Sequence, residues 1–219
     1  MIPALLQPLN RALTCVILID DDGTLKRDFR NMRVSQTEMD KSHARIVEGA
    51  TRLFREKGLE NTSVADVMSD AGLTHGGFYR HFENKDALVA AALQTAFDDI
   101  SSNLESRTGK TDPHAACDDF HNQYLSKRHL ENAGKGCPIP TLAGDVARGS
   151  TALRIAFGAG VKRLVTALAR GKSGSDEQKR AAAARELALI AGAMLIARAS
   201  DPETARTILA ACRDHDPAV

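Results

Sequence analysis

The chain has 219 residues, of which 43% are hydrophobic and 26% are charged, and its formal net charge is +1. These values fit one or two globular domains and exclude an intrinsically disordered chain, which would combine fewer apolar residues with a larger net charge. Because the net charge is close to zero, composition by itself does not indicate a nucleic-acid-binding protein. Alanine is abundant and aromatic residues make up only 4%, which favours closely packed helices.

Residues 1–38 are the least informative part of the sequence. The apolar, β-prone run from Leu13 to Ile19 is too short to span a membrane, since a spanning helix needs about 20 apolar residues. Three aspartates follow the run directly, and only Arg11 shortly precedes it, a pattern unlike a secretory signal. We therefore expect a cytoplasmic protein with no membrane partner.

Two interpretations of this N-terminal extension remain open. In the first, translation starts at Met32, and residues 1–31 are not part of the native protein. In the second, the extension is a genuine arm that is disordered until it binds nucleic acid through basic side chains. The basic residues that such an arm would use are Arg27, Arg30 and Arg33.

The four cysteines lie far apart in the sequence and form no C-x-x-C pair, so a zinc site is not expected. Scattered thiols in a helical chain fit a reducing cytoplasm better than a disulfide scaffold. Cys137 stands in a Gly-Lys-Gly-Cys-Pro stretch, where an exposed thiol would be redox-responsive. The favoured alternative is a small buried residue, because nothing in the sequence indicates a lowered thiol pKa.

Residues 41–85 contain three predicted helical segments. The first spans about 41–57 and ends at Gly58, with its inward face formed by Ile46, Ala50, Leu53 and Phe54. The second begins after Thr62 or Ser63, either of which can cap it, and ends at Gly72. Its apolar face consists of Val64, Val67, Met68 and Ala71. The third is capped by Thr74 and turns Phe78 and Phe82 inward, which completes a helix-turn-helix pattern.

The outward side of the third segment suits DNA. Thr74 and His75 lie at its N-terminal end, which is the end of a recognition helix that reads base edges. Gly76 and Gly77 each cost roughly 1 kcal/mol relative to alanine in a helix, and a close approach to DNA would offset that penalty. The competing interpretation is a helical hairpin whose polar face simply meets water.

The stretch 44–88 resembles the DNA-binding domain of the TetR family of transcriptional regulators. The matching pieces are Leu53-Phe54, Gly58, Thr62-Ser63-Val64, Val67, Ala71-Gly72-Leu73, Gly76, Phe78-Tyr79, His81-Phe82, Lys85 and Leu88. The resemblance implies that Thr74, His75 and Gly76 face bases. It implies phosphate contacts for Tyr79, His81 and Lys85, and an anchoring role for Thr62 or Ser63. The Gly76-Gly77 pair departs from the single glycine that is commoner in the family.

The rest of the chain reads as a series of helices. Asn84 caps a long helix to about Ser106, which joins the helix-turn-helix head to the remainder. Further helices are predicted over about 113–130, 142–149, 150–170, 176–199 and 202–213. The helix over 176–199 is apolar on more than one side, which favours self-association over a role as the central helix of a monomer. The resemblance implies a four-helix bundle across a two-fold axis.

These patterns together predict an all-α protein. We expect an extension over 1–38, a three-helix helix-turn-helix DNA-binding domain over 39–88, and a helical ligand-binding and dimerisation domain over 89–219. The implied function is a homodimeric repressor that binds a palindromic operator in double-stranded DNA and is released by a small-molecule inducer. No cofactor, metal or catalytic residue is expected. Candidate ligand-pocket residues are Phe97, Phe120, Tyr124, Cys137 and Phe157.

Two other classes of protein remain as alternatives. One is an enzyme that uses Cys137 with His114, His121 or His129, although no recognisable catalytic motif supports it. The other is a dimeric helical protein that binds a ligand or a partner without reading DNA. A metal held by His114 and His121 is disfavoured, because seven residues place them two helical turns apart.

Overall fold

The computed structural model describes residues 16–19, 25–28 and 36–213. The chain divides into two compact units, of which the first ends at Lys41. In the first unit, strand β1 (Val16–Ile19) pairs antiparallel with β2 (Leu25–Asp28). Residues 16–19 of the β-prone run thus form a strand, an addition to the predicted all-α class. Met32, Arg30 and Arg33 lie outside the described residues, so the expectations about the start site and the arm stay predictions.

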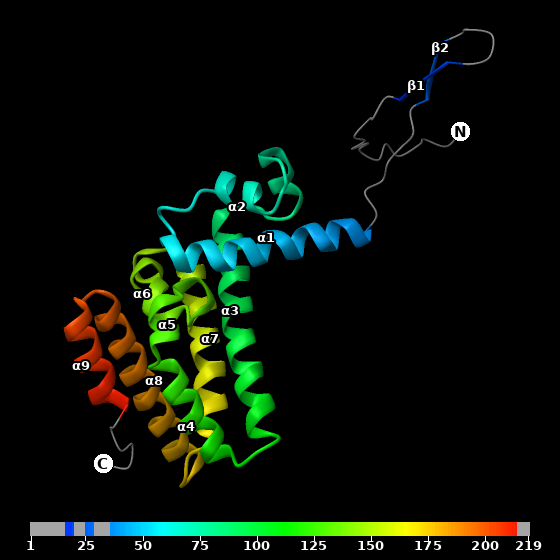
Figure 1. Cartoon of the computed structure of the whole chain (residues 1–219). Helices are drawn as coiled ribbons and strands as arrows, with labels where there is room; N and C mark the ends of the chain where they lie inside the picture. Colours follow the sequence, from blue (N-terminus) through cyan, green and yellow to red (C-terminus); the bar gives the residue numbers. More distant parts are fainter. Residues whose placement is uncertain (1–15, 20–24, 29–35, 214–219) are drawn as a thin grey trace. The chain divides into compact units, whose positions relative to one another are not determined.

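The helical part of the chain confirms the all-α prediction (Figure 1). Its elements are α1 (Gln36–Lys57), α2 (Val64–Asp70), the 3₁₀ helix η1 (His75–Arg80), α3 (Lys85–Thr108), α4 (Pro113–Tyr124), α5 (Lys127–Glu131), the 3₁₀ turn η2 (Ala133–Lys135), α6 (Ile139–Arg148), α7 (Thr151–Ala169), α8 (Asp176–Arg198) and α9 (Pro202–Arg213). Among the described helices, none combines the length and the apolar character that a bilayer crossing requires.

The single helix predicted over 113–130 is wrong, because the chain breaks between α4 and α5. Ser126 takes the N-cap position of α5, where its hydroxyl oxygen accepts a hydrogen bond from the His129 N–H at 3.2 Å. The preceding Leu125 is fully buried, which fixes the chain at the break. A serine that caps a new helix competes with continuation of the preceding one. With Leu125 buried and Ser126 capping α5, the chain ends α4 and begins a second helix.

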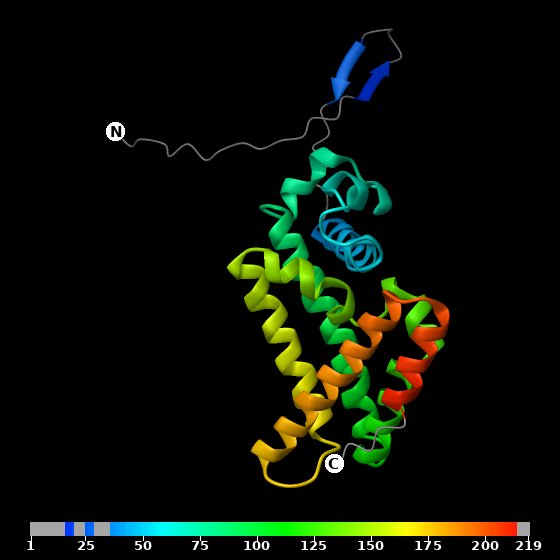
Figure 2. The same ribbon diagram turned by 90° about the vertical axis from the view of Figure 1, so that its left-hand side faces the viewer.

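Two hydrophobic cores lie along the paired helices α3 and α7, which run side by side in both ribbon views (Figures 1 and 2). The first core joins the helix-turn-helix head to the upper parts of these helices, including Leu93 of α3 and Leu153 of α7. The second core joins their other ends to α4, α8 and α9, including Leu104 and Leu164. Both cores are thus built on the same two helices.

Helices α3 and α7 pack closely where the Phe97 ring meets Gly160. Its fully buried ring lies against Gly160 of α7, where an added Cβ atom would overlap the ring. Phe157, one turn earlier on α7, meets the same ring edge to face, with centroids 5.4 Å apart. An edge-to-face pair of this kind contributes about 0.5–1.5 kcal/mol beyond the area that it buries. The glycine is therefore a packing requirement of this interface.

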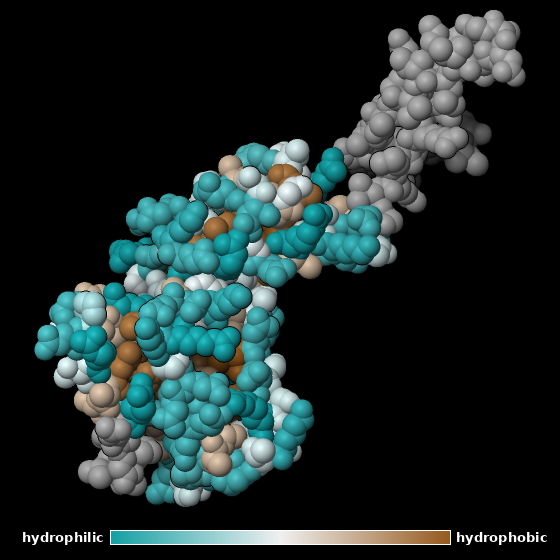
Figure 3. Space-filling view, in the orientation of Figure 1, coloured by the Kyte–Doolittle hydropathy of each residue, from teal (hydrophilic) through white to brown (hydrophobic). Residues whose placement is uncertain are grey.

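Helix α8 has one buried side and one partly exposed side. Ile190 and Met194 are fully buried in the second core, whereas the side chains of Leu195 and Ile196 are 53% and 50% exposed. The second apolar side of α8 is therefore partly exposed in the single chain, and its burial by self-association stays a prediction. The face of the molecule in Figure 3 is mostly hydrophilic.

Two glycines on α7 give a matched test of this packing. We expect Gly160→Ala to lower the free energy of unfolding by about 1–3 kcal/mol, because the added methyl group overpacks against Phe97. Gly158→Ala, two residues away, meets no atom within 4 Å and should raise stability by roughly 0.5–1 kcal/mol through helix propensity. Urea unfolding of both variants measures the difference, and equal effects would contradict the close approach.

Candidate nucleic-acid interface

The helix-turn-helix begins with a capping box at Ser63. The Ser63 hydroxyl oxygen accepts a hydrogen bond from the Asp66 N–H at 3.1 Å, and the Asp66 carboxylate accepts one from the Ser63 N–H at 2.8 Å. Thr62 does not cap α2, because it is fully buried and its hydroxyl donates to the Gly58 carbonyl at 2.9 Å. Of the two predicted anchoring residues, only Ser63 is exposed and on the surface of the head.

The turn and the recognition segment lie where the sequence predicted them, but the recognition segment is not the predicted type of helix. Gly72 adopts the left-handed φ of +68° that ends α2. The next segment is the 3₁₀ helix η1 and not an α-helix, and Thr74 at its N-cap makes no side-chain capping bond. Two glycines in six residues weaken the α-helix here, and a 3₁₀ turn serves such short pieces.

Phe78 and Phe82 fix η1 on the first core. Both side chains are buried, and their ring centroids lie 5.8 Å apart in a stacked arrangement. The His43 ring of α1 stacks on Phe82, with ring centroids 4.7 Å apart. Sequence reasoning missed this contact, because His43 is exposed on α1 and lies outside the apolar pattern of that helix. These rings hold η1 from beneath.

The opposite side of η1 is open to solvent. Thr74, His75 and Gly76 are all exposed, and the Tyr79 side chain is 72% exposed. A Cβ atom added at Gly76 would meet no atom within 4 Å, so nothing in the protein requires glycine at that position for space. We refer to Thr74, His75, Gly76 and Tyr79 as the recognition surface. An exposed tyrosine ring of this size is not explained by the protein's own packing.

His81 and Lys85 border the recognition surface but are not fully free. His81 is half-buried 5.8 Å from the His43 ring, and burial, followed by the nearby His43 and Arg80, lowers the pKa of His81. The Lys85 ammonium donates a hydrogen bond to the Leu59 carbonyl. Because an ammonium has three donors, this bond leaves others for a phosphate while it ties α3 to the α1–α2 loop.

Helix α3 starts beside this surface with its predicted cap. The Asn84 side-chain oxygen accepts a hydrogen bond from the Ala87 N–H at 2.9 Å. The remaining free N–H groups of the first turn carry the positive end of the helix dipole. A polar surface with glycine at its tip and a helix N-terminus at its edge has the features of a DNA-facing head.

Comparison with known proteins agrees with this geometry. Residues 46–92 match the family model described as "Bacterial regulatory proteins, tetR family". The chain is 39% identical over 64 residues to the HTH-type transcriptional regulator TtgR of Pseudomonas putida, which covers 29% of this chain and 30% of that protein. It is 36% identical over 61 residues to the HTH-type transcriptional repressor DhaR of a Mycobacterium species, over 28% and 31% of the two chains.

Solved structures extend the likeness over the whole helical fold. A TetR-family regulator from Cytophaga hutchinsonii aligns with a TM-score of 0.64 and 24% identity, over 82% of this chain and 94% of that one. The reduced form of NemR from E. coli aligns with a TM-score of 0.63 and 20% identity, over 81% and 100% of the two chains. Residues 46–92 are therefore similar to the DNA-binding part of TetR-family regulators, and the helical chain shares their fold. Its sequence matches to these two curated relatives span 30% and 31% of their length.

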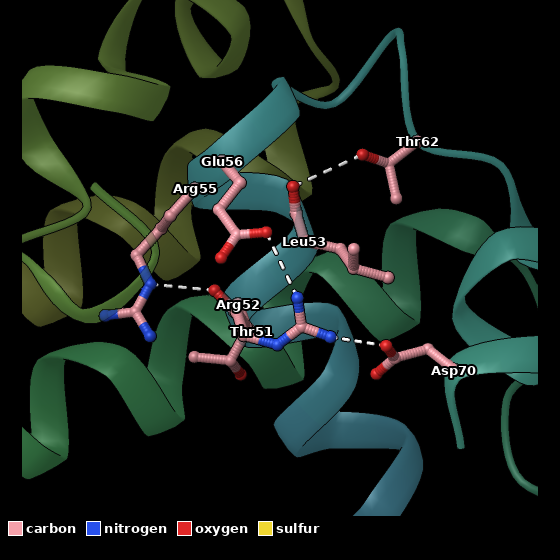
Figure 4. Close-up of polar contacts among 7 residues, drawn as sticks. All are labelled: Thr51, Arg52, Leu53, Arg55, Glu56, Thr62 and Asp70. Carbon is pink, nitrogen blue, oxygen red and sulfur yellow. Dashed lines mark hydrogen bonds and ion pairs between the residues drawn. The ribbon is translucent and has the colours of Figure 1, made fainter. Parts of the chain in front are cut away.

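Ion pairs of Arg52 on α1 brace the helix-turn-helix head (Figure 4). Arg52 binds Glu56 on its own helix at 3.1 Å and also pairs with Asp70 at the end of α2. Arg55, one turn of α1 away from Thr51, donates to the Thr51 carbonyl at 2.7 Å. Arg52 therefore fastens α2 to α1 across the helix-turn-helix.

Two polar contacts fasten the head to the rest of the chain. Arg55 donates to the Gly136 carbonyl, in the loop before α6, at 2.6 Å. The Leu59 N–H donates to the Asp145 carboxylate on α6 at 2.8 Å. These partners are 81 and 86 residues apart in sequence, so helical periodicity could not reveal them. They make the α5–α6 region the support of the head.

The five predicted pocket residues are divided between the two hydrophobic cores. Phe97 and Phe157 belong with the first core, whereas Phe120, Tyr124 and Cys137 belong with the second. The structure instead has a groove of about 580 Å³ between α1 and α3, beside η2. Its lining includes Val47, Thr51, Arg55, Ala91, Thr95 and Asp98, and none of the five predicted residues.

Cys137 has a structural environment. The residue is 2% exposed, and burial raises the pKa of its thiol. Its N–H donates to His129 Nε2 at 3.0 Å, so the His129 proton lies on Nδ1, which donates to the Tyr124 carbonyl at 2.7 Å. His114 instead pairs with Asp118 on an exposed face of α4. The buried-residue interpretation of Cys137 fits this structure better than a reactive thiol.

Asp145 offers a direct test of how the head is held. We expect Asp145→Ala to lower the free energy of unfolding by about 1–3 kcal/mol and to speed hydrogen exchange at the Leu59 amide, because that N–H loses its acceptor. Asp145→Asn keeps a carbonyl oxygen at the same place and should cost clearly less. Urea unfolding and amide exchange measured by NMR provide both readouts. An unchanged Leu59 exchange rate in Asp145→Ala would contradict the contact.

Proposed function

We propose that this protein is a sequence-specific DNA-binding regulator of transcription, in the form of a repressor that a small molecule releases from its operator. The observation that carries the proposal is the recognition surface. A tyrosine that is 72% exposed and an open glycine stand on a segment held from beneath by buried aromatic rings. This surface lies within the part of the chain that matches the TetR family model.

Each side chain has a role in the proposed DNA contact. Thr74, His75 and Gly76 face base edges in the major groove, where the missing side chain of Gly76 lets the backbone approach closely. Tyr79, His81 and Lys85 contact phosphates and fix the register of the head. Ser63 anchors α2 to the DNA backbone, while the buried Thr62 acts from inside by holding the α1–α2 loop.

The proposed active form is a homodimer built on α8 and α9. Leu195 and Ile196 give α8 an exposed apolar strip in the single chain. A Cβ atom added at Gly192, on the same helix, would meet nothing within 4 Å, which leaves room for a second backbone. Two copies joined there as a four-helix bundle present two heads to a palindromic operator, about one DNA turn or a multiple apart.

The proposed division of labour follows the sequence boundaries. Residues 39–88 contact DNA, and residues 89–219 bind the inducer and form the dimer, in the cytoplasm where the DNA lies. An inducer that prefers a wider spacing of the heads shifts the population away from the operator-fitting form. The Arg55–Gly136 and Leu59–Asp145 contacts transmit that preference, since they couple the head to the α5–α6 region.

Fluorescence anisotropy with the DNA that flanks the protein's own gene tests the proposal. We expect binding that weakens as salt rises, because phosphate contacts release counterions. Tyr79→Ala should weaken binding roughly tenfold or more, the effect of losing a contact worth about 1.4 kcal/mol. Gly76→Ala should also weaken binding while leaving the fold intact, because its added methyl group meets only the DNA.

Gly158→Ala is the matched control, since it adds the same methyl group at an equally open position on α7. It should bind like the wild type. Binding that is equal in Tyr79→Ala, Gly76→Ala and the wild type would contradict the recognition surface. A dimer that binds no DNA in this assay would favour the alternative, a helical protein that binds a ligand or partner without reading DNA.

A further inference from the structure

A buried charged cluster joins four parts of the helical fold far from the recognition surface. His121 of α4 lies with Nδ1 3.2 Å from a carboxylate oxygen of Glu186 on α8. Its Nε2 lies 3.1 Å from the carbonyl oxygen of Cys212, in the last turn of α9. Lys172, in the loop between α7 and α8, places its ammonium 2.6 Å from the other Glu186 oxygen.

The geometry fixes the protonation of His121. Both ring nitrogens face acceptors, and a neutral imidazole has only one N–H to donate, so the doubly protonated ring alone satisfies both contacts. The hydrogen bond to Glu186 raises the pKa of His121, although burial opposes it. Burial would raise the pKa of Glu186, but hydrogen bonds from His121 and Lys172 hold it below its ordinary value.

The other charged and titratable groups near this cluster do not replace His121. Arg213 of α9 donates to the Leu125 carbonyl at 2.8 Å. The Cys117 thiol, one turn before His121 on α4, has its pKa raised by burial and then by Glu186. Asp118 is committed to the exposed pair with His114 at 2.9 Å.

We propose that His121 is a proton-dependent latch, which in its protonated form holds the last turn of α9 on α4 and α8 and which releases that turn when the ring loses a proton. When the ring loses one proton, the other stays between Nδ1 and Glu186, whose charge is then balanced by Lys172 alone. The Nε2 lone pair then faces the Cys212 carbonyl oxygen, and the contact becomes repulsive.

The direction of the pH effect follows from the sign of the shift. The pKa of His121 is raised in the folded chain, so the latch is fully closed below the ordinary histidine pKa of about 6.5. It opens as pH rises through the higher folded-state value. This inference rests on the described side chains of α4, α8 and α9, and it holds whether or not the protein binds DNA.

NMR of the full chain between pH 6 and pH 9 tests the latch. We expect the amides of residues 209–213 to shift and to lose exchange protection with the same midpoint as the His121 ring. Glu186→Gln should move both midpoints together to lower pH, because the carboxylate that favours the charged ring is gone. Amides of α9 that remain unchanged while His121 titrates would overturn the proposal.

A matched pair of histidine variants gives a second, independent decision. His121→Gln should remove the pH dependence of the α9 amides, since its side chain has no proton to lose in this range. His114→Gln, on an exposed face of the same helix, should keep the wild-type dependence. If His121→Gln does not fold, the proposal is still tested by comparing the titration midpoints of the His121 ring and of the α9 amides in the wild type and in Glu186→Gln. A dependence that survives in folded His121→Gln overturns the latch.

Discussion

The contact of Phe97 with Gly160 is the constraint on which the rest of the helical fold depends. It brings α3 and α7 close enough to share both hydrophobic cores, one next to the head and one next to α8 and α9. Helix α3 has 24 residues and so extends about 36 Å as one rigid element. Because its first turn belongs to the head and its last turns to the second core, a change at either end reaches the other through one helix.

The recognition surface is exposed because the opposite side of its segment is buried in the first core. Phe78 and Phe82 are buried in the first core, which leaves His75, Gly76 and Tyr79 on the exposed side of the segment. Polar bonds then fix where this surface stands. Ser63 starts α2, Arg52 fastens α2 to α1, and Lys85 ties α3 to the α1–α2 loop. The functional proposal therefore rests on local packing as well as on family likeness.

The sequence predicted those features that are set by neighbours in the chain. Apolar spacing and caps gave the end of α1 at Gly58, the turn at Gly72 and the start of α3 at Asn84, because each depends on a few adjacent residues. It could not predict features that depend on distant partners. The Arg55–Gly136 bond, the burial of Thr62 and the division of the five pocket residues between two cores all require the folded chain. The 3₁₀ form of η1 could be predicted only in part. Its two glycines are evident in the sequence, but the sequence does not show that they replace the α-helix with a 3₁₀ helix.

The most direct measurement of the central claim is a selection of bound sequences from a random double-stranded DNA library, carried out with the full chain. The account predicts enrichment of an inverted repeat whose half-sites are about one helical turn, or a multiple, apart. It also predicts that this enrichment disappears when the same selection is made with Tyr79→Ala. Recovery of no common motif by the wild type, or of the same motif by both proteins, would contradict a DNA-reading role for the recognition surface.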